Sequence, residues 1–298
     1  MKKHLLLGLI LNIFFSCDKS EESIVTDLDP NFEKYLVEKK IDKDGVVNGK
    51  MERQNAMGID SIYVPFLKIN SLNGIENFKD LVYLYCPQNS FSILDLSQNV
   101  KLKYLECGSN QLRVLNLGVN NSIEIVGCSS NLLLDLDITQ LKNLVLLNCS
   151  RNRIEILNIG QNSTLYDLRC SSNLLKNLDV GKCMNLNSMD CSGNKLSGID
   201  ISQNSKMMYL DCSVNLFQSI NIPKTLKMRI LNVANNQITN LDLRNQPDIR
   251  YLVSTKNLIK EICVDDIEKA IKNTKTTYYT GQNYHWETDA TTTFSLCK

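Results

Sequence analysis

Residues 102 to 110 read LKYLECGSN, and close variants of this stretch return along the chain. It reappears as LVLLNCSRN at 144–152, LYDLRCSSN at 165–173 and LNSMDCSGN at 186–194. The cysteine recurs every 21 residues, at Cys86, Cys107, Cys128, Cys149, Cys170, Cys191 and Cys212, and Val233 and Ser254 continue the column. A second column has no gap and consists of Asn89, Asn110, Asn131, Asn152, Asn173, Asn194, Asn215, Asn236 and Asn257. Such a period indicates a stacked repeat architecture.

Each unit follows the pattern LxxLxCxxNxLxxLxLxxN, with two variable residues after it. The LxC and LxL pieces alternate apolar and polar residues, which predicts two short, half-buried strands per unit. The asparagine amide can donate to and accept from the backbone of neighbouring turns, so we expect stacked copies to form a ladder. One unit can bury its apolar side chains only against its neighbours, which predicts an elongated, gently curved solenoid.

This pattern resembles the leucine-rich repeat, specifically the 21-residue bacterial class called IRREKO, whose second half carries LDL. The resemblance implies a solenoid of short parallel β-strands with about nine repeats, covering residues 72–264. The stretches at 29–42 and 71–86 resemble the helical N-terminal cap and entry repeat of internalins, and the cap is assigned to 29–71. Its helix is expected within 29–42, with Asp29 as N-cap, Pro30 in the first turn, and Phe32, Leu36 and Val37 on one face. The segment 265–298 is predicted to be a mixed C-terminal cap that begins with a short helix at 265–273.

The cysteine column occupies an inward apolar position, because Val233 replaces the cysteine without disturbing the pattern. Free cysteine packs as a small hydrophobe. Parallel strands lie about 4.8 Å apart, so disulfides or a thiol metal site are the alternatives. Each cysteine would have identical neighbours on both sides and no histidine accompanies the column, which favours buried free thiols. Cys183 lies outside the column and is also predicted to be a thiol buried in a turn.

The first residues resemble a bacterial lipoprotein signal. A basic start, an apolar run from Leu5 to Phe15 and a small residue before Cys17 predict a signal peptide at 1–16 and lipidation of Cys17. The alternative is an ordinary signal peptide. Residues 17–28 are predicted to be an acidic tether, and DKSEES at 18–23 resembles a surface-export tag, with a plain solvated tether as the alternative. We therefore expect an exported outer-membrane lipoprotein, held to the membrane by its lipid anchor only.

Two other cysteines, Cys263 and Cys297, lie near or in the C-terminal cap. Disulfides persist in exported proteins, so we predict that these two cysteines pair.

The outward positions of the first strand vary, as those of a binding surface would. The candidate ligand-binding residues are Tyr83, Tyr85, Tyr104, Glu106, Asp167, Arg169, Asp190, Tyr209, Asp211 and Tyr251. Exposed tyrosine provides contact area with a polar tip, and the resemblance places this strand on the concave face of the solenoid. The alternative is that these side chains simply cover the sheet.

Two stretches could suggest calcium. The residue inside LxL is always Asp or Asn: Asp95, Asn116, Asp137, Asn158, Asp179, Asp200, Asn221 and Asp242. Stacked carboxylates repel, and bonding of the side chain to the local backbone is favoured instead. The loop DKDGVVNGK at 42–50 lacks an acidic ligand of the EF-hand pattern, which favours a turn. No metal site or cofactor is predicted, although calcium on the Asp/Asn column stays open.

The chain is not expected to be an enzyme, because one histidine, His285, remains after the signal peptide and no phosphate loop or nucleophile with a base is present. Removing Lys2 and Lys3 from 33 basic groups leaves 31 against 32 acidic groups, so no nucleic-acid partner is expected. We predict a monomeric binding module for a protein or glycan. The alternative is a structural scaffold or the recognition subunit of an outer-membrane surface complex. The ligand and the membrane leaflet stay open.

Overall fold

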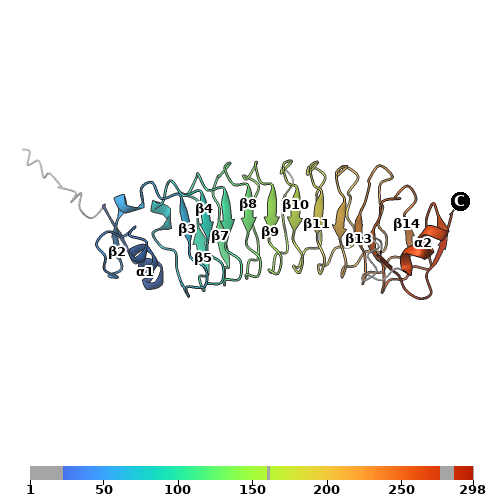
Figure 1. Cartoon of the computed structure of the whole chain (residues 1–298), viewed down its shortest axis with the longest axis horizontal. Helices are drawn as coiled ribbons and strands as arrows, with labels where there is room; N and C mark the ends of the chain where they lie inside the picture. Colours follow the sequence, from blue (N-terminus) through green and yellow to red (C-terminus); the bar gives the residue numbers. More distant parts are fainter. Residues whose placement is uncertain (1–22, 160–161, 276–284, 298) are drawn as a thin grey trace, which may run out of the picture.

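Each repeat forms one turn of an elongated solenoid with a cap at each end (Figure 1). The computed structural model describes residues 23–159, 162–275 and 285–297. The predicted signal peptide and Cys17 lie outside these residues. The predicted leucine-rich repeat architecture of stacked parallel strands is confirmed.

One parallel sheet of eleven strands runs along the solenoid, and its strands are three residues long. In spatial order they are β3 (Ser61–Tyr63), β4 (Tyr83–Tyr85), β6 (Tyr104–Glu106), β8 (Ile125–Gly127), β9 (Leu146–Asn148), β10 (Asp167–Arg169), β11 (Ser188–Asp190), β12 (Tyr209–Asp211), β13 (Ile230–Asn232), β15 (Tyr251–Val253) and β17 (His285–Glu287). Nine of these strands come from the nine predicted repeats. β3 and β17 come from the segments assigned to the caps, so the sheet continues into both ends.

The second strand of each unit forms only near the ends of the solenoid. β5 (Ile93–Asp95) pairs with β7 (Val114–Asn116), and β14 (Asn240–Asp242), β16 (Glu261–Cys263) and β18 (Thr293–Ser295) form a three-stranded sheet. Between them, one isolated bridge joins Asp135 to Ile156 among the described residues. The prediction of a strand at every LxL is therefore wrong for the middle repeats. Successive repeats are rotated slightly relative to one another, so adjacent turns keep the spacing of paired strands on only one side along the whole solenoid. That side is the eleven-stranded sheet.

The asparagine column forms the predicted ladder. Asn131 is typical: its Nδ2 donates to the carbonyl of Cys107 in the preceding turn at 3.1 Å and to that of Cys128 in its own turn at 3.0 Å. Its Oδ1 accepts from the backbone N–H of Leu112 at 2.9 Å. Each asparagine thus links two turns through buried hydrogen bonds.

A second, partial ladder lies at the turn that follows LxL. Asn99, Asn120 and Asn204 each donate to two carbonyl oxygens, and Asn162 donates to one. Cys183 occupies the same position, with its Sγ 3.9 Å from the carbonyl of Ile159. The sequence signal was weak, because this column is interrupted by other residue types.

The core is a continuous column of leucine, isoleucine and cysteine side chains that point inward from successive turns. Leu105, Cys107 and Leu112 of one turn are fully buried, as are Leu147, Cys149 and Ile154 two turns later. Burying one large apolar side chain stabilises by about 1.5–3 kcal/mol, and most of that burial is against adjacent turns. Stacking is therefore the main source of stability.

The N-terminal end contains α1 (Pro30–Glu38), the antiparallel pair β1 (Ile24–Thr26) and β2 (Lys50–Glu52), and a 3₁₀ turn at Arg53–Ala56. A second 3₁₀ turn, Ile75–Asn77, lies in the first repeat. Asp29 caps α1 as predicted, because its carboxylate accepts from the N–H groups of Asn31 and Phe32. The buried face of α1 contains Phe32, Tyr35 and Leu36, whereas Val37 is only half-buried. The C-terminal cap contains α2 (Ile267–Thr274).

Candidate functional site

The outer face of the eleven-stranded sheet carries all ten candidate binding residues. Tyr83 and Tyr85 lie on β4, Tyr104 and Glu106 on β6, Asp167 and Arg169 on β10, Asp190 on β11, Tyr209 and Asp211 on β12, and Tyr251 on β15. In-register pairing arranges them in two columns that cross the strands. The structure thus places them on one face, but it divides them into regions with different chemistry.

The N-terminal end of this face is a tyrosine cluster, defined as Tyr63, Tyr83, Tyr85 and Tyr104. The rings of Tyr83 and Tyr104 stack with centroids 4.4 Å apart, and those of Tyr63 and Tyr85 stack at 4.8 Å. Tyr83 and Tyr85 join the two stacks at 6.4 Å. Burial raises the pKa of Tyr104 to about 12, and the neighbouring Tyr83 hydroxyl and Glu106 carboxylate add to the rise. The cluster is therefore a stacked aromatic surface in which Tyr104 stays uncharged at pH 7.

Tyr63 was missed by the sequence reasoning. It pairs with Tyr85 in the sheet although the two are one residue further apart than the repeat period. Its side chain is 57% exposed, so it adds aromatic surface at the end of the sheet. The alternation in SIYV at 61–64 is the signal that could have identified this strand.

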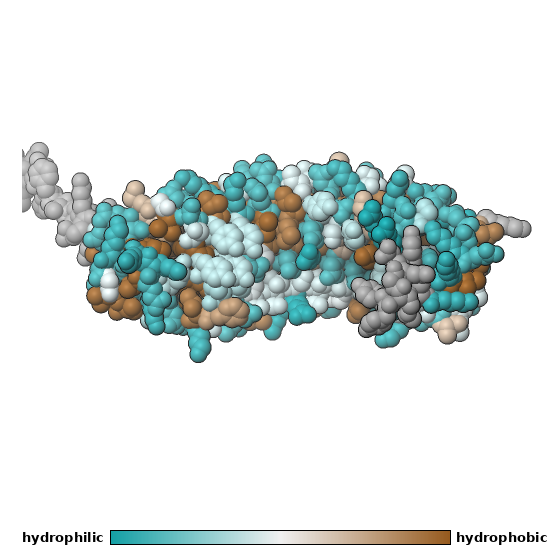
Figure 2. Space-filling view, viewed as in Figure 1, coloured by the Kyte–Doolittle hydropathy of each residue, from teal (hydrophilic) through white to brown (hydrophobic). Residues whose placement is uncertain are grey.

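The centre of the face becomes apolar and then polar. Half-buried Ile125 on β8 and Leu146 on β9 follow Tyr104 in its column. Figure 2 shows a strip of apolar side chains next to a paler patch on its N-terminal side. Beyond β9, the guanidinium of Arg169 pairs with the buried Asp167 carboxylate at 2.7 Å, which raises the pKa of Arg169. This pair satisfies both charges within the protein.

The remaining acidic candidates are also bonded internally. Asp190 accepts from the backbone N–H of Ser192 at 3.0 Å and from its hydroxyl at 2.6 Å. Asp211 accepts equivalent bonds from Ser213, and its second oxygen accepts from Asn232 Nδ2 at 2.8 Å. The polar centre of the face is therefore largely self-satisfied.

At the C-terminal end, the ring of Tyr251 packs against that of His285 with centroids 5.6 Å apart. His285 Nε2 lies 2.6 Å from the Glu287 carboxylate on the same strand. Tyr209 is half-buried on β12. Among the described residues, no stacked ring pair other than those in the tyrosine cluster lies on this sheet face.

The seven column cysteines and Cys183 are free and buried, as predicted. Burial raises the pKa of each of these thiols, to about 12 at Cys149 and about 11 at Cys183. A thiol that stays protonated is a poor nucleophile and a poor metal ligand. The described residues contain no group of three or more His, Cys, Asp or Glu side chains suited to a metal ion.

The Asp/Asn column inside LxL caps its own turns. Asp137 Oδ1 accepts from the backbone N–H of Thr139 at 2.9 Å and from its hydroxyl at 2.7 Å. These bonds lower the pKa of Asp137, and bonds from Ser202 lower that of Asp200 in the same way. The local bonding predicted for this column is confirmed for Asp95, Asn116, Asp137, Asp179, Asp200 and Asp242.

The loop at 42–50 forms turns around two carboxylates. Asp44 accepts from the N–H of Val46 and from Asn48 Nδ2, each at 2.8 Å. The Glu33 carboxylate of α1 accepts from the backbone N–H groups of Asn48, Gly49 and Lys50. Burial and the neighbouring Asp44 raise the pKa of Asp42. Most carboxylate oxygens in this loop therefore bond to the protein itself.

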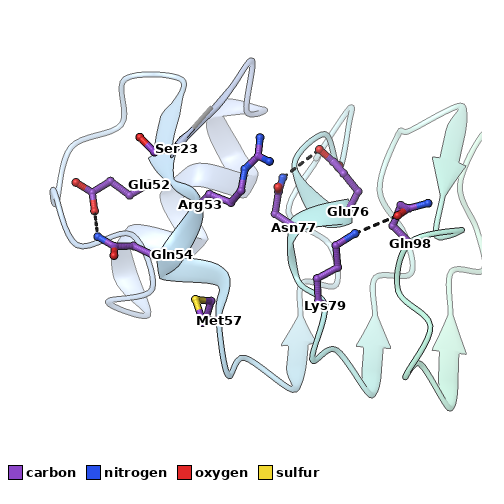
Figure 3. Close-up of a pocket in the computed structure, with 9 residues that line it drawn as sticks. All are labelled: Ser23, Glu52, Arg53, Gln54, Met57, Glu76, Asn77, Lys79 and Gln98. Atoms are coloured by element: carbon purple, nitrogen blue, oxygen red, sulfur yellow. Dashed lines mark hydrogen bonds between the residues drawn. The ribbon is translucent and has the colours of Figure 1, made fainter. Parts of the chain in front are cut away.

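A hollow of about 670 Å³ lies where the N-terminal cap meets the repeats. Figure 3 shows that its side chains come from both parts, including Arg53 and Met57 from the cap and Glu76 and Lys79 from the first turns. Glu76 accepts from Asn77 Nδ2, and Lys79 donates to Gln98 at 3.2 Å. These groups pair with neighbours along the wall, so they do not converge on one point in the hollow.

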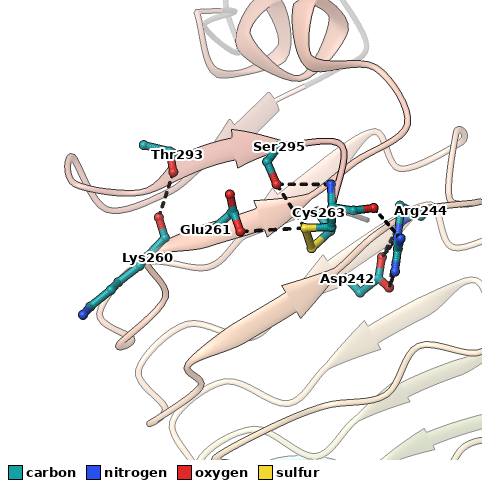
Figure 4. Close-up of a disulfide and its surroundings, with 8 residues drawn as sticks. Asp242, Arg244, Lys260, Glu261, Cys263, Thr293 and Ser295 are labelled. Atoms are coloured by element: carbon teal, nitrogen blue, oxygen red, sulfur yellow. Dashed lines mark hydrogen bonds and ion pairs between the residues drawn. A yellow bond between two sulfur atoms is a disulfide. The ribbon is translucent and has the colours of Figure 1, made fainter.

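The predicted disulfide is present in the C-terminal cap. Cys263 on β16 is bonded to Cys297, with their Cα atoms 5.4 Å apart (Figure 4). Beside it, Arg244 pairs with Asp242 at 2.7 Å and donates to the Cys297 carbonyl at 2.7 Å. The chain terminus is thus fastened to the last LxL strands.

Several solved structures share this architecture. The functional domain of InlJ from Listeria monocytogenes, which includes a cysteine ladder, superposes with a TM-score of 0.67 and 22% identity, covering 90% of this chain and 60% of the InlJ chain. The leucine-rich effector YopM from Yersinia pestis gives 0.54 and 20% identity, over 79% of this chain and 73% of YopM.

This chain has a leucine-rich repeat fold. The leucine-rich repeat ectodomain of the Arabidopsis thaliana receptor kinase GASSHO1/SCHENGEN3, solved in complex with CASPARIAN STRIP INTEGRITY FACTOR 2, gives a TM-score of 0.52 and 18% identity over 71% of this chain and 32% of that chain. No protein-family model matches the chain, and no curated protein does. At these identities the leucine-rich repeat likeness concerns the fold, and the chain spans 60% of the InlJ chain.

Within the described residues of this leucine-rich repeat chain, no helix is long and apolar enough to cross a membrane. The lipid anchor predicted at Cys17 lies outside those residues.

Proposed function

We propose that this leucine-rich repeat protein is a non-catalytic binding protein of the cell envelope that holds a partner protein against the outer face of its eleven-stranded sheet. The tyrosine cluster carries this proposal. Its four stacked rings are half-buried or exposed, and aromatic side chains with polar tips are enriched at interface centres.

Two further observations support a protein partner. The inward positions repeat the same residue types, whereas the outward ones change from tyrosine to isoleucine to aspartate along the sheet. The ectodomain of similar fold from Arabidopsis thaliana was solved with a bound factor, so this architecture can present a binding surface. A glycan is the alternative ligand, because sugar rings can also pack against stacked tyrosine rings.

The polar centre of the face, taken alone, favours the alternative function, which is a structural scaffold without a ligand. Asp167, Asp190 and Asp211 all bond to neighbouring side chains, which is what a sheet face without a ligand needs. A partner is therefore expected to contact the tyrosine cluster and the adjoining apolar strip rather than the whole face.

Site-specific photocrosslinking in intact cells tests this. Benzoylphenylalanine at position 63, which is 57% exposed on the sheet face, should give one discrete protein adduct. The matched control is position 156, which is 75% exposed on the LxL side and should give none. Adducts that are absent at 63, or identical at both positions, would argue for the scaffold.

We also propose that the protein is exported and anchored to the outer membrane through lipidated Cys17. The sequence pattern before Cys17 supports this. Cys17→Ser should move the protein from the membrane fraction to the soluble fraction, and unchanged membrane retention would contradict the anchor.

A further inference from the structure

One carboxylate on the sheet face differs from the others. Asp167, Asp190, Asp211 and Glu287 each lie within 2.8 Å of a nitrogen or hydroxyl oxygen of another side chain. Glu106 accepts from the backbone N–H of Gly108 at 2.9 Å, and no side-chain donor to it is found among the described residues. The two lysines that precede β6 pair with other carboxylates, Lys101 with Asp80 at 2.7 Å and Lys103 with Glu124 at 3.2 Å.

The fold provides room for this carboxylate. Glu106 leans across the neighbouring strand, where Gly127 has no side chain. A Cβ at Gly127 would lie 2.0 Å from Glu106 Oε2, so any larger residue there would displace the carboxylate. Burial raises the pKa of Glu106, which means that its negative charge is incompletely solvated and lacks a compensating cation.

Aromatic rings lie beside the same group. Tyr85 precedes Glu106 in its column, and Tyr104 lies two residues before it on β6. The charge of Glu106 also contributes to raising the pKa of both tyrosines. Tyr63 on β3 stacks on the Tyr85 ring of β4 from one side. Glu106 on β6 pairs with Tyr85 in the sheet from the other side.

We propose that Glu106, Tyr85 and Tyr104 form a receptor for one basic side chain, arginine or lysine, of the partner protein. This inference rests on the proposed function and names the chemistry of its central contact. A cation would supply the charge that Glu106 lacks, and the adjacent rings attract cations through their π-systems. Arginine is favoured over lysine, because its planar guanidinium is less strongly hydrated and can both pair with a carboxylate and stack on tyrosine.

The site is tested by NMR on the full chain with ¹³C-labelled tyrosine rings. Titration with N-acetyl-arginine amide should shift the ring signals of Tyr85 and Tyr104, the lysine analogue should do so more weakly, and the neutral glutamine analogue should not. Glu106→Gln should weaken arginine binding about tenfold, because a charge-assisted hydrogen bond is lost. Asp211→Asn, on the same face but bonded to Ser213 and Asn232, is the matched control and should bind like the wild type.

A second variant tests the geometry without changing a charge. Gly127→Ala puts a methyl group where the Glu106 carboxylate lies, so it should also weaken arginine binding. Equal arginine affinity in wild type, Glu106→Gln and Gly127→Ala, or equal shifts with the glutamine analogue, would overturn the inference.

The two experiments together distinguish failure of the arginine receptor from failure of the proposed binding function. If the adduct at position 63 forms equally in wild type and Glu106→Gln, and arginine binding is also unchanged, the receptor is refuted while the binding face stands. If arginine binds as expected but no adduct forms at position 63, the partner proposal fails instead.

Discussion

The two sides of each turn share the same apolar spacing, but the structure uses them differently. On the sheet side, strands pair from β3 to β17 and the outward residues vary from Tyr104 to Asp167. On the LxL side, strands pair only near the ends, and the residue inside LxL is Asp or Asn in the eight repeats from Asp95 to Asp242. The residue inside LxL closes its own turn and varies only between Asp and Asn, whereas the equivalent bond on the sheet side is made only at some positions, such as Glu106, Asp190 and Asp211. Specificity is therefore expected on the sheet side.

The largest effect is expected where the LxL side is closed by the disulfide. Replacing both Cys263 and Cys297 with serine removes a bridge that spans 34 residues and ties the terminus to β16. Loop-closure entropy predicts a loss of about 3–4 kcal/mol in the free energy of unfolding. The fluorescence of Trp286, the one tryptophan and buried in β17, reports on this cap during urea unfolding. An unchanged Trp286 transition would show that LxL pairing holds the cap without the bridge.

A smaller effect should separate the two sides in the middle of the solenoid. Asn152→Ala removes bonds to the carbonyls of Cys128 and Cys149 and from the N–H of Leu133, all buried, at a cost of about 1–3 kcal/mol. Asp200→Ala removes a bond to the N–H of Ser202 at an exposed turn, where water can replace it, and should lower the melting temperature much less. Thermal melts of the two variants check this, and equal losses would contradict the difference between the sides.

The smallest effect is a pH dependence of opposite sign on the two sides. The Thr139 hydroxyl and N–H lower the pKa of folded Asp137 below its ordinary 3.8, so their stabilisation is present above that pH and is lost as pH falls through the folded pKa. Burial raises the pKa of Glu106 above 4.5, so ionising it costs stability as pH rises past that value.

Variants at these two positions should therefore respond to pH in opposite ways. Relative to wild type, Asp137→Asn should melt lower at pH 7 and Glu106→Gln should melt higher; the Glu106 difference should vanish as the pH falls below 4.5, and the Asp137 difference should shrink only as the pH falls below 3.8. Melting temperatures measured across this range test the signs. A lower melting temperature for Glu106→Gln at pH 7 would mean that the carboxylate stabilises the free protein and is not held in reserve for a cation.

The sequence by itself determined the features that repeat. The spacing of Cys107 and Asn110 predicted an inward thiol and a turn ladder, and the structure confirms both because each turn meets an identical environment in its neighbours. The local capping by Asp137 followed from residues two positions apart. Pairing of Cys263 with Cys297 was predicted from composition and compartment, and the structure contains it. The domain boundaries, the lipid anchor and the role of the ten candidate residues stay predictions.

Only the tertiary structure decided the features that depend on the position of the functional group at the tip of a side chain. Tyr63 joins the tyrosine cluster from outside the 21-residue register, and β17 continues the sheet although it lies far along the chain from β15. Asp190 and Asp211 repeat the same bonds to Ser192 and Ser213, but the other sheet-face carboxylates follow no period. Asp167 pairs with Arg169, whereas Glu106 lies over Gly127 without a side-chain donor among the described residues. A repeat fixes the backbone position of every residue through contacts between adjacent turns. Which long polar side chains meet depends on distances of a few ångströms between particular neighbours, which no periodicity encodes.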